Sequence, residues 1–166
     1  MDDKTDQKER LDWIEKAGLE NMKLHHACAD TLSKEAATTL TLSLAGMGGG
    51  LAYAAKSLDQ GHWTWFAVGA AAFTAWLCYV SWYLTTKCLM MREIDQVYNE
   101  PKNLDSPDDT LEYLRRCELL SLQIRIDSAG QRNARLAGHL NKARKFAIGS
   151  PLVFIFFSLA WVALGH

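Results

Sequence analysis

Residues 63–86 read WTWFAVGAAAFTAWLCYVSWYLTT and contain no Asp, Glu, Lys or Arg. At a rise of about 1.5 Å per residue, a helix of this length crosses a hydrocarbon layer about 30 Å thick. Aromatic residues gather at both ends of the stretch: Trp63, Trp65 and Phe66 at the first end, and Tyr79, Trp82 and Tyr83 at the second. Aromatic rings are enriched at both membrane–water interfaces, so this stretch predicts a transmembrane helix.

The stretch belongs to one of three windows that hold none of the 37 charged side chains of the chain, namely residues 36–55, 60–86 and 146–165. The average composition hides this segregation, because 166 residues with 49% hydrophobic side chains and a net charge of −1 fit a soluble domain. Each window has the length of a membrane span. We therefore predict an all-α integral membrane protein with three transmembrane helices and a cytoplasmic helical region.

The distribution of Lys and Arg predicts the orientation of these spans. Residues 1–35 hold six of the 18 cations and residues 87–145 hold eleven, whereas the loop between the first two spans holds only Lys56. A cytoplasmic N-terminus therefore places 17 of the 18 cations inside, with the loop 57–62 and His166 outside. The predicted segments are an N-terminal cytoplasmic helix (1–35), a two-span hairpin (36–86), a cytoplasmic helical region (87–145) and a third transmembrane helix (146–166).

The start of the chain, MDDKTDQKER, lacks the basic and apolar regions of a signal peptide, so we expect the first span to act as its own insertion signal. The cysteines fit a reducing cytoplasm, because three of them fall on the predicted inner side and one falls within the second span: Cys28, Cys88 and Cys117, and Cys78.

The first span is the least apolar, and its small residues are the candidate pore-lining or helix-packing positions: Thr39, Ser43, Gly46, Gly48, Gly49 and Gly50. Small residues let helices approach closely in a bilayer, and the pair Gly46 and Gly50 has the spacing of a helix-packing motif. Two interpretations remain open. The segment packs tightly against the second span of the same chain, or it forms a subunit interface or the wall of a water-filled pore.

No span contains an ionisable Asp, Glu, Lys or Arg. Proton pumps, ion-coupled transporters and voltage sensors place such groups at membrane depth, so these classes are disfavoured, as is an intramembrane metalloprotease. The third span is strongly apolar, and its start at Gly149, Ser150 and Pro151 predicts a kink or a break.

The cytoplasmic segments are expected to be helical. One stripe at spacings of three and four covers residues 6–34, and Ser106 followed by Pro107 predicts the start of a second helix that runs to about Lys145. This second helix carries a seam with a 3.5-residue repeat and one polar member, Asn133: Leu119, Leu122, Ile126, Ala129, Asn133, Leu136, Leu140 and Ala143. The seam packs either on the N-terminal helix or on another subunit. Residues 120–126 also alternate as a strand would, but the continuing heptad favours helix.

Five arginines on the second cytoplasmic helix are candidate contacts for phosphate groups of a ligand or of lipid: Arg115, Arg116, Arg125, Arg132 and Arg135. The alternative is that they pair with Glu112, Glu118, Asp127 or the acidic N-terminus. Aromatic residues are not interleaved among them, so stacking on bases is not supported. The cations at the membrane end of this helix, Lys142, Arg144 and Lys145, are expected to face anionic lipid.

Catalytic chemistry is not predicted. His25, His26, Cys28 and Asp30 form the only cluster with metal-binding residue types, and their spacing supplies no set of four ligands. A nucleotide-binding glycine loop and a nucleophile motif are also missing from the sequence. We therefore predict a non-enzyme without a metal or cofactor, and the near balance of charges argues against a double-stranded nucleic acid as a partner.

A cytoplasmic helix, a two-span hairpin with a short outer loop and further cytoplasmic helices together resemble the SLATT-type two-span membrane effectors of bacterial anti-phage systems. The resemblance covers residues 6–145 as an architecture, and the third span at residues 146–165 is additional to it. It implies a bacterial inner-membrane protein that forms a homo-oligomeric pore. The pore is closed until a cytoplasmic signal, such as a nucleotide-type ligand or a signal-producing partner protein, reaches it.

The leading functional hypothesis is accordingly a gated oligomeric pore that disrupts the inner membrane in anti-phage defence. A second hypothesis is an accessory or scaffold subunit, which uses its spans as an anchor and its cytoplasmic helices to recruit a partner. A third is a holin-like lysis protein, against which the 58-residue inner segment 88–145 weighs.

Overall fold

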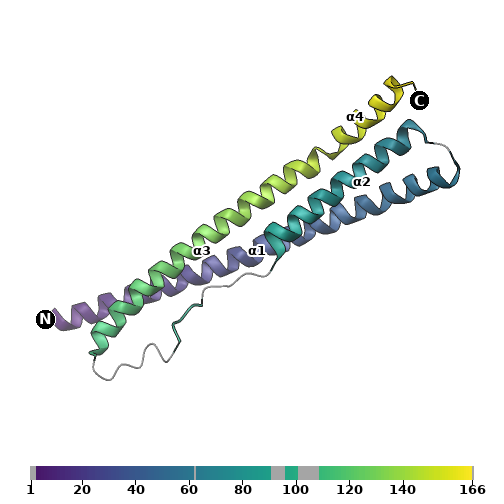
Figure 1. Ribbon diagram of the computed structural model, residues 1–166. Coiled ribbons are helices and arrows are strands. Elements are labelled where there is room, and N and C mark those ends of the chain that lie inside the picture. The colour runs from purple at the N-terminus through teal and green to yellow at the C-terminus, as the bar shows by residue number, and fades with distance from the viewer. Residues whose placement is uncertain (1–2, 62, 91–95, 101–108, 166) are drawn as a thin grey trace. The chain divides into compact units, whose positions relative to one another are not determined.

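The computed structural model describes residues 3–61, 63–90, 96–100 and 109–165, and the regular structure in these ranges is helical. Helix α1 (Asp3–Asp59) is followed by helix α2 (Trp65–Leu84), the π-helical turn η1 (Thr85–Leu89), helix α3 (Leu111–Ile148) and helix α4 (Ser150–Ala163) (Figure 1). The prediction of an all-α chain is therefore confirmed for these ranges. Helix is also the correct choice for residues 120–126, whose alternation fitted a strand as well.

The chain divides into two compact units. The first, here called the polar unit, consists of Met1–Thr31 with Arg92–Arg135, and the second, the apolar unit, consists of Leu32–Met91 with Leu136–His166. Helices α1 and α3 contribute to both units.

In the apolar unit, α1 and α2 are joined by a short connection. Gly61 has a φ of +67°, which glycine adopts without the steric cost that a side chain brings. The backbone at Thr64 is extended, and the Thr64 hydroxyl accepts a hydrogen bond from the Ala67 amide at 3.2 Å, so that it caps the first turn of α2.

The break that the sequence predicts at the start of the third span is confirmed at Gly149, between α3 and α4. Pro151 has no amide hydrogen to donate to the carbonyl group of Ala147 four residues earlier. The Ser150 hydroxyl donates to that carbonyl oxygen at 2.7 Å and satisfies it. The chain can therefore pass Pro151 without leaving an unpaired acceptor in an apolar environment.

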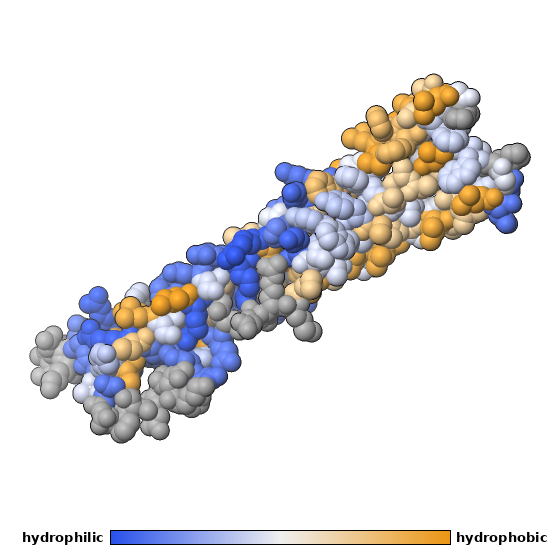
Figure 2. Space-filling model, viewed as in Figure 1, coloured by the Kyte–Doolittle hydropathy of each residue, from blue (hydrophilic) through white to orange (hydrophobic). Residues whose placement is uncertain are grey.

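The core of the apolar unit forms where α2 meets α1 and the end of α3, and α2 also packs along α4 (Figure 1). Its buried members are Ala36, Val80, Tyr83, Leu84, Leu140 and Ala143. At Gly69 the helices α2 and α4 lie so close that an added Cβ would overlap the Ser158 hydroxyl and approach the Phe154 ring at 2.9 Å. Much of the visible surface of this unit is apolar (Figure 2).

Two helical stretches of the described chain are long and apolar enough to cross a membrane, namely Trp65–Leu89 and an apolar window within Leu111–Ala163. By length and composition, these stretches support membrane association. Residues 36–55 of α1 are less apolar, because they include four glycines, three threonines and a serine.

In the polar unit, α1 and α3 pack along the predicted heptad seam. Met22 of α1 is fully buried and contacts the seam residues Leu122, Ile126 and Ala129. The polar member of the seam, Asn133, donates from Nδ2 to the carbonyl oxygen of His25 at 2.8 Å. In this unit the partner of the seam is therefore the N-terminal helix of the same chain, which settles the alternative that the sequence leaves open.

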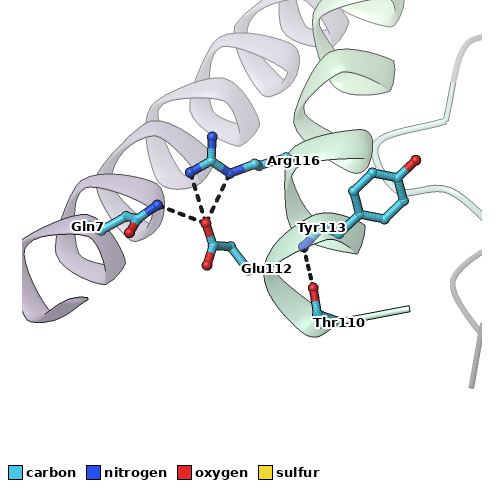
Figure 3. Close-up of polar contacts among 5 residues, drawn as sticks. All are labelled: Gln7, Thr110, Glu112, Tyr113 and Arg116. Atoms are coloured by element: carbon cyan, nitrogen blue, oxygen red, sulfur yellow. Dashed lines mark hydrogen bonds and ion pairs between the residues drawn. The ribbon is translucent and has the colours of Figure 1, made fainter. Parts of the chain in front are cut away.

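Helix α3 begins later than the sequence predicts. Ser106 and Pro107 lie outside the described residues, whereas Asp109 and Thr110 are described and are not helical. The Thr110 hydroxyl accepts from the Tyr113 amide at 3.4 Å (Figure 3), so Thr110 takes the capping role that we expected of Ser106.

Candidate functional site

The small-residue segment of α1 has two different faces within the apolar unit. One face is buried or half-buried and contacts α2 at Ala36, Met47 and Gly50. Its members recur at spacings of three and four: Ala36, Leu40, Ser43, Met47, Gly50, Ala54 and Ser57. This is the spacing of a coiled-coil seam, so one stripe of α1 stays in contact with its neighbour over the length of a membrane span.

The four glycines of this segment do not act together. A Cβ on Gly46 would lie 2.8 Å from the Leu77 side chain, and one on Gly50 would overlap the Thr74 hydroxyl, so both glycines permit the close approach of α2. A Cβ added at Gly48 or Gly49 would meet no atom within 4 Å. Of the six predicted positions, the half-buried Thr39 and the buried Ser43 also lie toward the packed side.

The opposite face of the same segment is exposed and consists of small side chains at the same alternating spacing: Thr38, Thr41, Ala45, Gly48, Ala52 and Ala55. Their sizes leave the α1 backbone accessible to a second helix. We call this stripe the open face of α1. The exposed Gly48, Thr38 and Thr41 belong to it, which the sequence pattern by itself does not reveal.

The hydroxyl groups on this part of α1 are satisfied within the helix. Thr38 and Thr41 donate to the carbonyl oxygens of Lys34 and Ala37 at 2.9 and 3.0 Å, and Ser43 donates to Thr39 at 3.0 Å. This pattern lets a hydroxyl lie at membrane depth without a missing partner. Each oxygen retains a lone pair that can accept from water, so the open face tolerates either a helix or water beside it.

A groove of about 660 Å³ lies between α1, α2 and α4 in the apolar unit. Its lining is almost entirely apolar and includes aromatic side chains from α2 and α4, among them Phe66, Phe73 and Phe154. Polar groups that fix the orientation of a small ligand are lacking in this lining, which suits hydrocarbon rather than a metabolite.

Where α2 meets the end of α3, a polar and aromatic cluster occupies one side of the apolar unit. The Tyr83 hydroxyl and His139 Nδ1 are 2.8 Å apart and hydrogen bonded, and the Lys142 ammonium lies 5.7 Å from the centroid of the Phe146 ring. Trp76 Nε1 donates to the carbonyl oxygen of Phe146 at 2.9 Å. Aromatic rings with one polar tip are typical of membrane interfaces. Sequence reasoning missed His139, because a single histidine in a long helix carries no signal of its partner.

Three of the five candidate arginines in the polar unit are paired with carboxylates. Arg115 bonds Asp12 and Glu15 of α1 at 2.5 and 2.7 Å. These two hydrogen bonds, with Glu15 as the larger contribution, raise the pKa of Arg115 above its ordinary value. Two pairs lie within α3: Arg116 with Glu112 at 2.8 Å, to which Gln7 of α1 also donates (Figure 3), and Arg125 with Glu118 at 2.5 Å.

The remaining two arginines differ from these three. The terminal guanidinium nitrogens of Arg132 are buried and have no hydrogen-bond partner among the described atoms, and Arg135 donates to the carbonyl oxygen of Gln131 at 3.3 Å. The paired arrangement has neutralised most of the positive charge that a phosphate group would need. At the apolar unit, Arg144 pairs with Glu35 at 2.9 Å.

A pocket of about 300 Å³ opens between α1 and α3 in the polar unit, beside Tyr98. Leucine side chains form most of its lining, which also includes Glu15, Arg115 and Glu118. These three charged groups are already paired, so the pocket favours an apolar ligand group over a phosphate.

The residues that could bind a metal do not converge. Within residues 3–61, 63–90, 96–100 and 109–165, no group of three or more His, Cys, Asp or Glu side chains is placed to hold a metal ion. His25 instead contacts Asn133 through its backbone and lies 3.4 Å from a Cβ built on Gly130.

Comparison of the chain with protein-family models, with curated proteins and with solved structures found no match.

Proposed function

We propose that this chain is a subunit of a homo-oligomeric membrane pore, which is closed until a cytoplasmic signal opens it. In this proposal the chain crosses the bacterial inner membrane three times, with its N-terminus inside and its C-terminus outside. The observation that carries the proposal is the open face of α1, an exposed stripe of small residues along a segment of membrane length.

The open face supports self-association for a physical reason. Lipid tails are as apolar as leucine, so helices in a bilayer associate where small side chains let their backbones pack closely. The face that contains Gly46 and Gly50 is already used against α2 of the same chain, which leaves the face with Gly48 to other copies. The threonines on this face add acceptor atoms that water in a pore can reach.

The first span in this proposal, residues 36–55 of α1, is additional to the two candidate spans in α2 and α4. A charge-free stretch of 20 residues is long enough to span, and its packed face contacts α2, which is itself a candidate span. Its lower hydropathy is explained if neighbouring copies, rather than lipid, cover the open face.

The location of the N-terminus tests the number of spans. We expect a single cysteine introduced as Thr5→Cys in a chain whose native cysteines are replaced by serine to be protected from a membrane-impermeant maleimide in intact spheroplasts. A matched Asp59→Cys variant is expected to be labelled, because residue 59 ends α1 on the predicted outer side. Labelling of both residues before lysis would mean that α1 does not span, and labelling of residue 5 alone would mean that α1 spans in the opposite direction.

Conductance tests the pore itself. We expect purified protein in planar bilayers to carry current, and Gly48→Leu to abolish the current because a leucine on the open face prevents the close approach of another helix. Gly138→Leu is the matched control, because its Cβ also meets no atom within 4 Å but lies on α3. A monomeric particle without conductance would refute the proposal, as would equal loss of current in both variants.

The physiological role that we propose is anti-phage defence, in which opening of the pore depolarises the infected cell. Its support is the resemblance to SLATT-type effectors together with a cytoplasmic unit that contains a leucine-lined pocket. The partners in this proposal are membrane lipid, further copies of the chain, and a nucleotide-type ligand or a signal-producing protein. Since three of the five arginines are paired with carboxylates, we expect the leucine-lined pocket to receive an apolar part of such a signal rather than its phosphate groups.

A second candidate function is an accessory or scaffold subunit, and one observation favours it. Trp13 and Leu24 of α1 are 72% and 69% exposed in the polar unit, where a lipid environment does not account for them. Stoichiometric co-purification of another protein, together with a monomeric state of the chain alone, would favour this function over the pore.

A further inference from the structure

Helix α3 has a second apolar stripe, on the side that does not face α1. Its members are Tyr113, Cys117, Leu120 and Ile124, and the last two are 69% and 70% exposed. The Tyr113 ring lies on the side of α3 away from α1 (Figure 3). The strand-like alternation in the sequence now has an explanation, because Leu122 and Ile126 are buried toward α1 while Leu120 and Ile124 point to the opposite side.

The stripe has the geometry of a short coiled-coil seam. Its spacings of four, three and four residues place Cys117 and Ile124 at the a positions of a heptad and Tyr113 and Leu120 at the d positions. A β-branched residue at a, here Ile124, with leucine at d, here Leu120, favours a parallel coiled coil of two helices.

We propose that this stripe binds the same stripe of a second copy, so that two α3 helices form a parallel two-stranded seam in the polar unit. The inference rests on the proposed membrane insertion, because copies that are inserted in the same orientation present their α3 helices in parallel. We call the four residues Tyr113, Cys117, Leu120 and Ile124 the α3 seam.

The charges beside the α3 seam are compatible with a second copy. In a parallel pair, the flanking residues Arg116 and Gln123 lie opposite Ser121 and Ser128 of the other helix, so like charges do not face one another there. Arg116 is also neutralised by Glu112 at 2.8 Å.

The α3 seam also has a defined end. The next d position is Asp127, which would face its own copy and repel it. Asp127 instead accepts a hydrogen bond from Gln123 Nε2 at 2.9 Å.

A membrane surface is a poorer occupant for this stripe. Helices that lie on anionic membranes are flanked by several Lys or Arg residues, whereas the stripe is flanked by one arginine that is already paired. The outer side of α1 is also a poorer seam, because Trp13 and Leu24 are eleven residues apart with Ala17 and Glu20 between them.

Cysteine cross-linking in native membranes tests the proposal, since Cys117 lies at an a position and would face Cys117 of the second copy. We expect copper-phenanthroline oxidation of the full chain to produce a disulfide-linked dimer, in which mass spectrometry identifies Cys117 joined to Cys117. A variant that retains only Cys117 is expected to give the same dimer. A variant that retains only Cys28, which is also exposed in the polar unit, is expected to give little dimer.

A charge introduced into the α3 seam provides a second test of the proposal. Leu120→Asp is expected to lower the initial rate of Cys117 cross-linking by about tenfold, since like charges would then oppose each other across the seam. The exposed Gln131→Asp, beyond the end of the seam, is the matched control and is expected to leave that rate unchanged.

The outcomes separate this seam from the pore proposal. An oligomeric, conducting particle without Cys117 dimers overturns the seam and leaves the pore intact, whereas a monomeric particle overturns both. Linkage of Cys117 to a different protein, or to Cys28 of another copy, also overturns the seam.

Discussion

A Gly69→Ala variant is expected to loosen the packing of α4 on α2 and to lower the free energy of unfolding by about 1–3 kcal/mol, the usual cost of overpacking. The new methyl group would overlap the Ser158 hydroxyl, so Ser158 would have to change its rotamer, and the methyl group would also press on the Phe154 ring at 2.9 Å. Thermal unfolding in detergent micelles, followed by tryptophan fluorescence, measures the effect.

Two companion variants make this prediction specific. Ser158→Ala removes the overlapping atom, so the double variant Gly69→Ala with Ser158→Ala is expected to recover most of the lost stability. Ser158→Ala alone is expected to be neutral or stabilising, because the Ser158 hydroxyl is buried without a hydrogen-bond partner among the described residues. Gly48→Ala is the control for the change of residue type, and a loss as large as that of Gly69→Ala would contradict the prediction.

Met22→Ala is expected to lower the stability of the polar unit by about 2–5 kcal/mol, because it leaves a cavity in a core that few residues fill. Met22 is fully buried and contacts Leu122, Ile126 and Ala129. Hydrogen–deuterium exchange of the full chain measures the effect, through faster exchange of the backbone amides in residues 15–30 and 118–133.

The amides of the apolar unit provide an internal reference in the same experiment, and we expect their exchange to remain unchanged. Leu24→Ala is the matched control on the same helix. Leu24 is 69% exposed, so its truncation is expected to change the stability by less than about 0.5 kcal/mol. Equal effects of the two variants would show that Met22 does not belong to a core.

Much of the fold follows from local patterns. A helix needs only its own backbone bonds and a periodic apolar stripe, so the heptad from Leu119 to Ala143 and the stretch Gly149, Ser150 and Pro151 are sufficient to predict α3 and its end. The sequence places the start of α3 too early, at Ser106. Both Ser106, which precedes a proline, and Thr110 have side chains that can cap a helix. Only the non-helical backbone at Asp109 and Thr110 shows that Thr110 is the cap.

Local sequence patterns predict less of the candidate site than of the fold. Gly46 and Gly48 are alike in composition and lie two residues apart, yet one lies against Leu77 and the other has no neighbour. The arginines of α3 were equally ambiguous, since pairing with Asp12 and Glu15 depends on residues about 100 positions away.

The sequence by itself therefore determines the helical class of this protein, the uncharged stretches of membrane length and the segregation of charge between them, since each depends on residues close together in the chain. Only the tertiary structure decides which face of α1 is packed and which is open, and that α3 carries two apolar stripes rather than one. The reason is that the 3.6-residue period places a side chain on a face of its helix, whereas the partner of that face is contributed by a distant part of the chain.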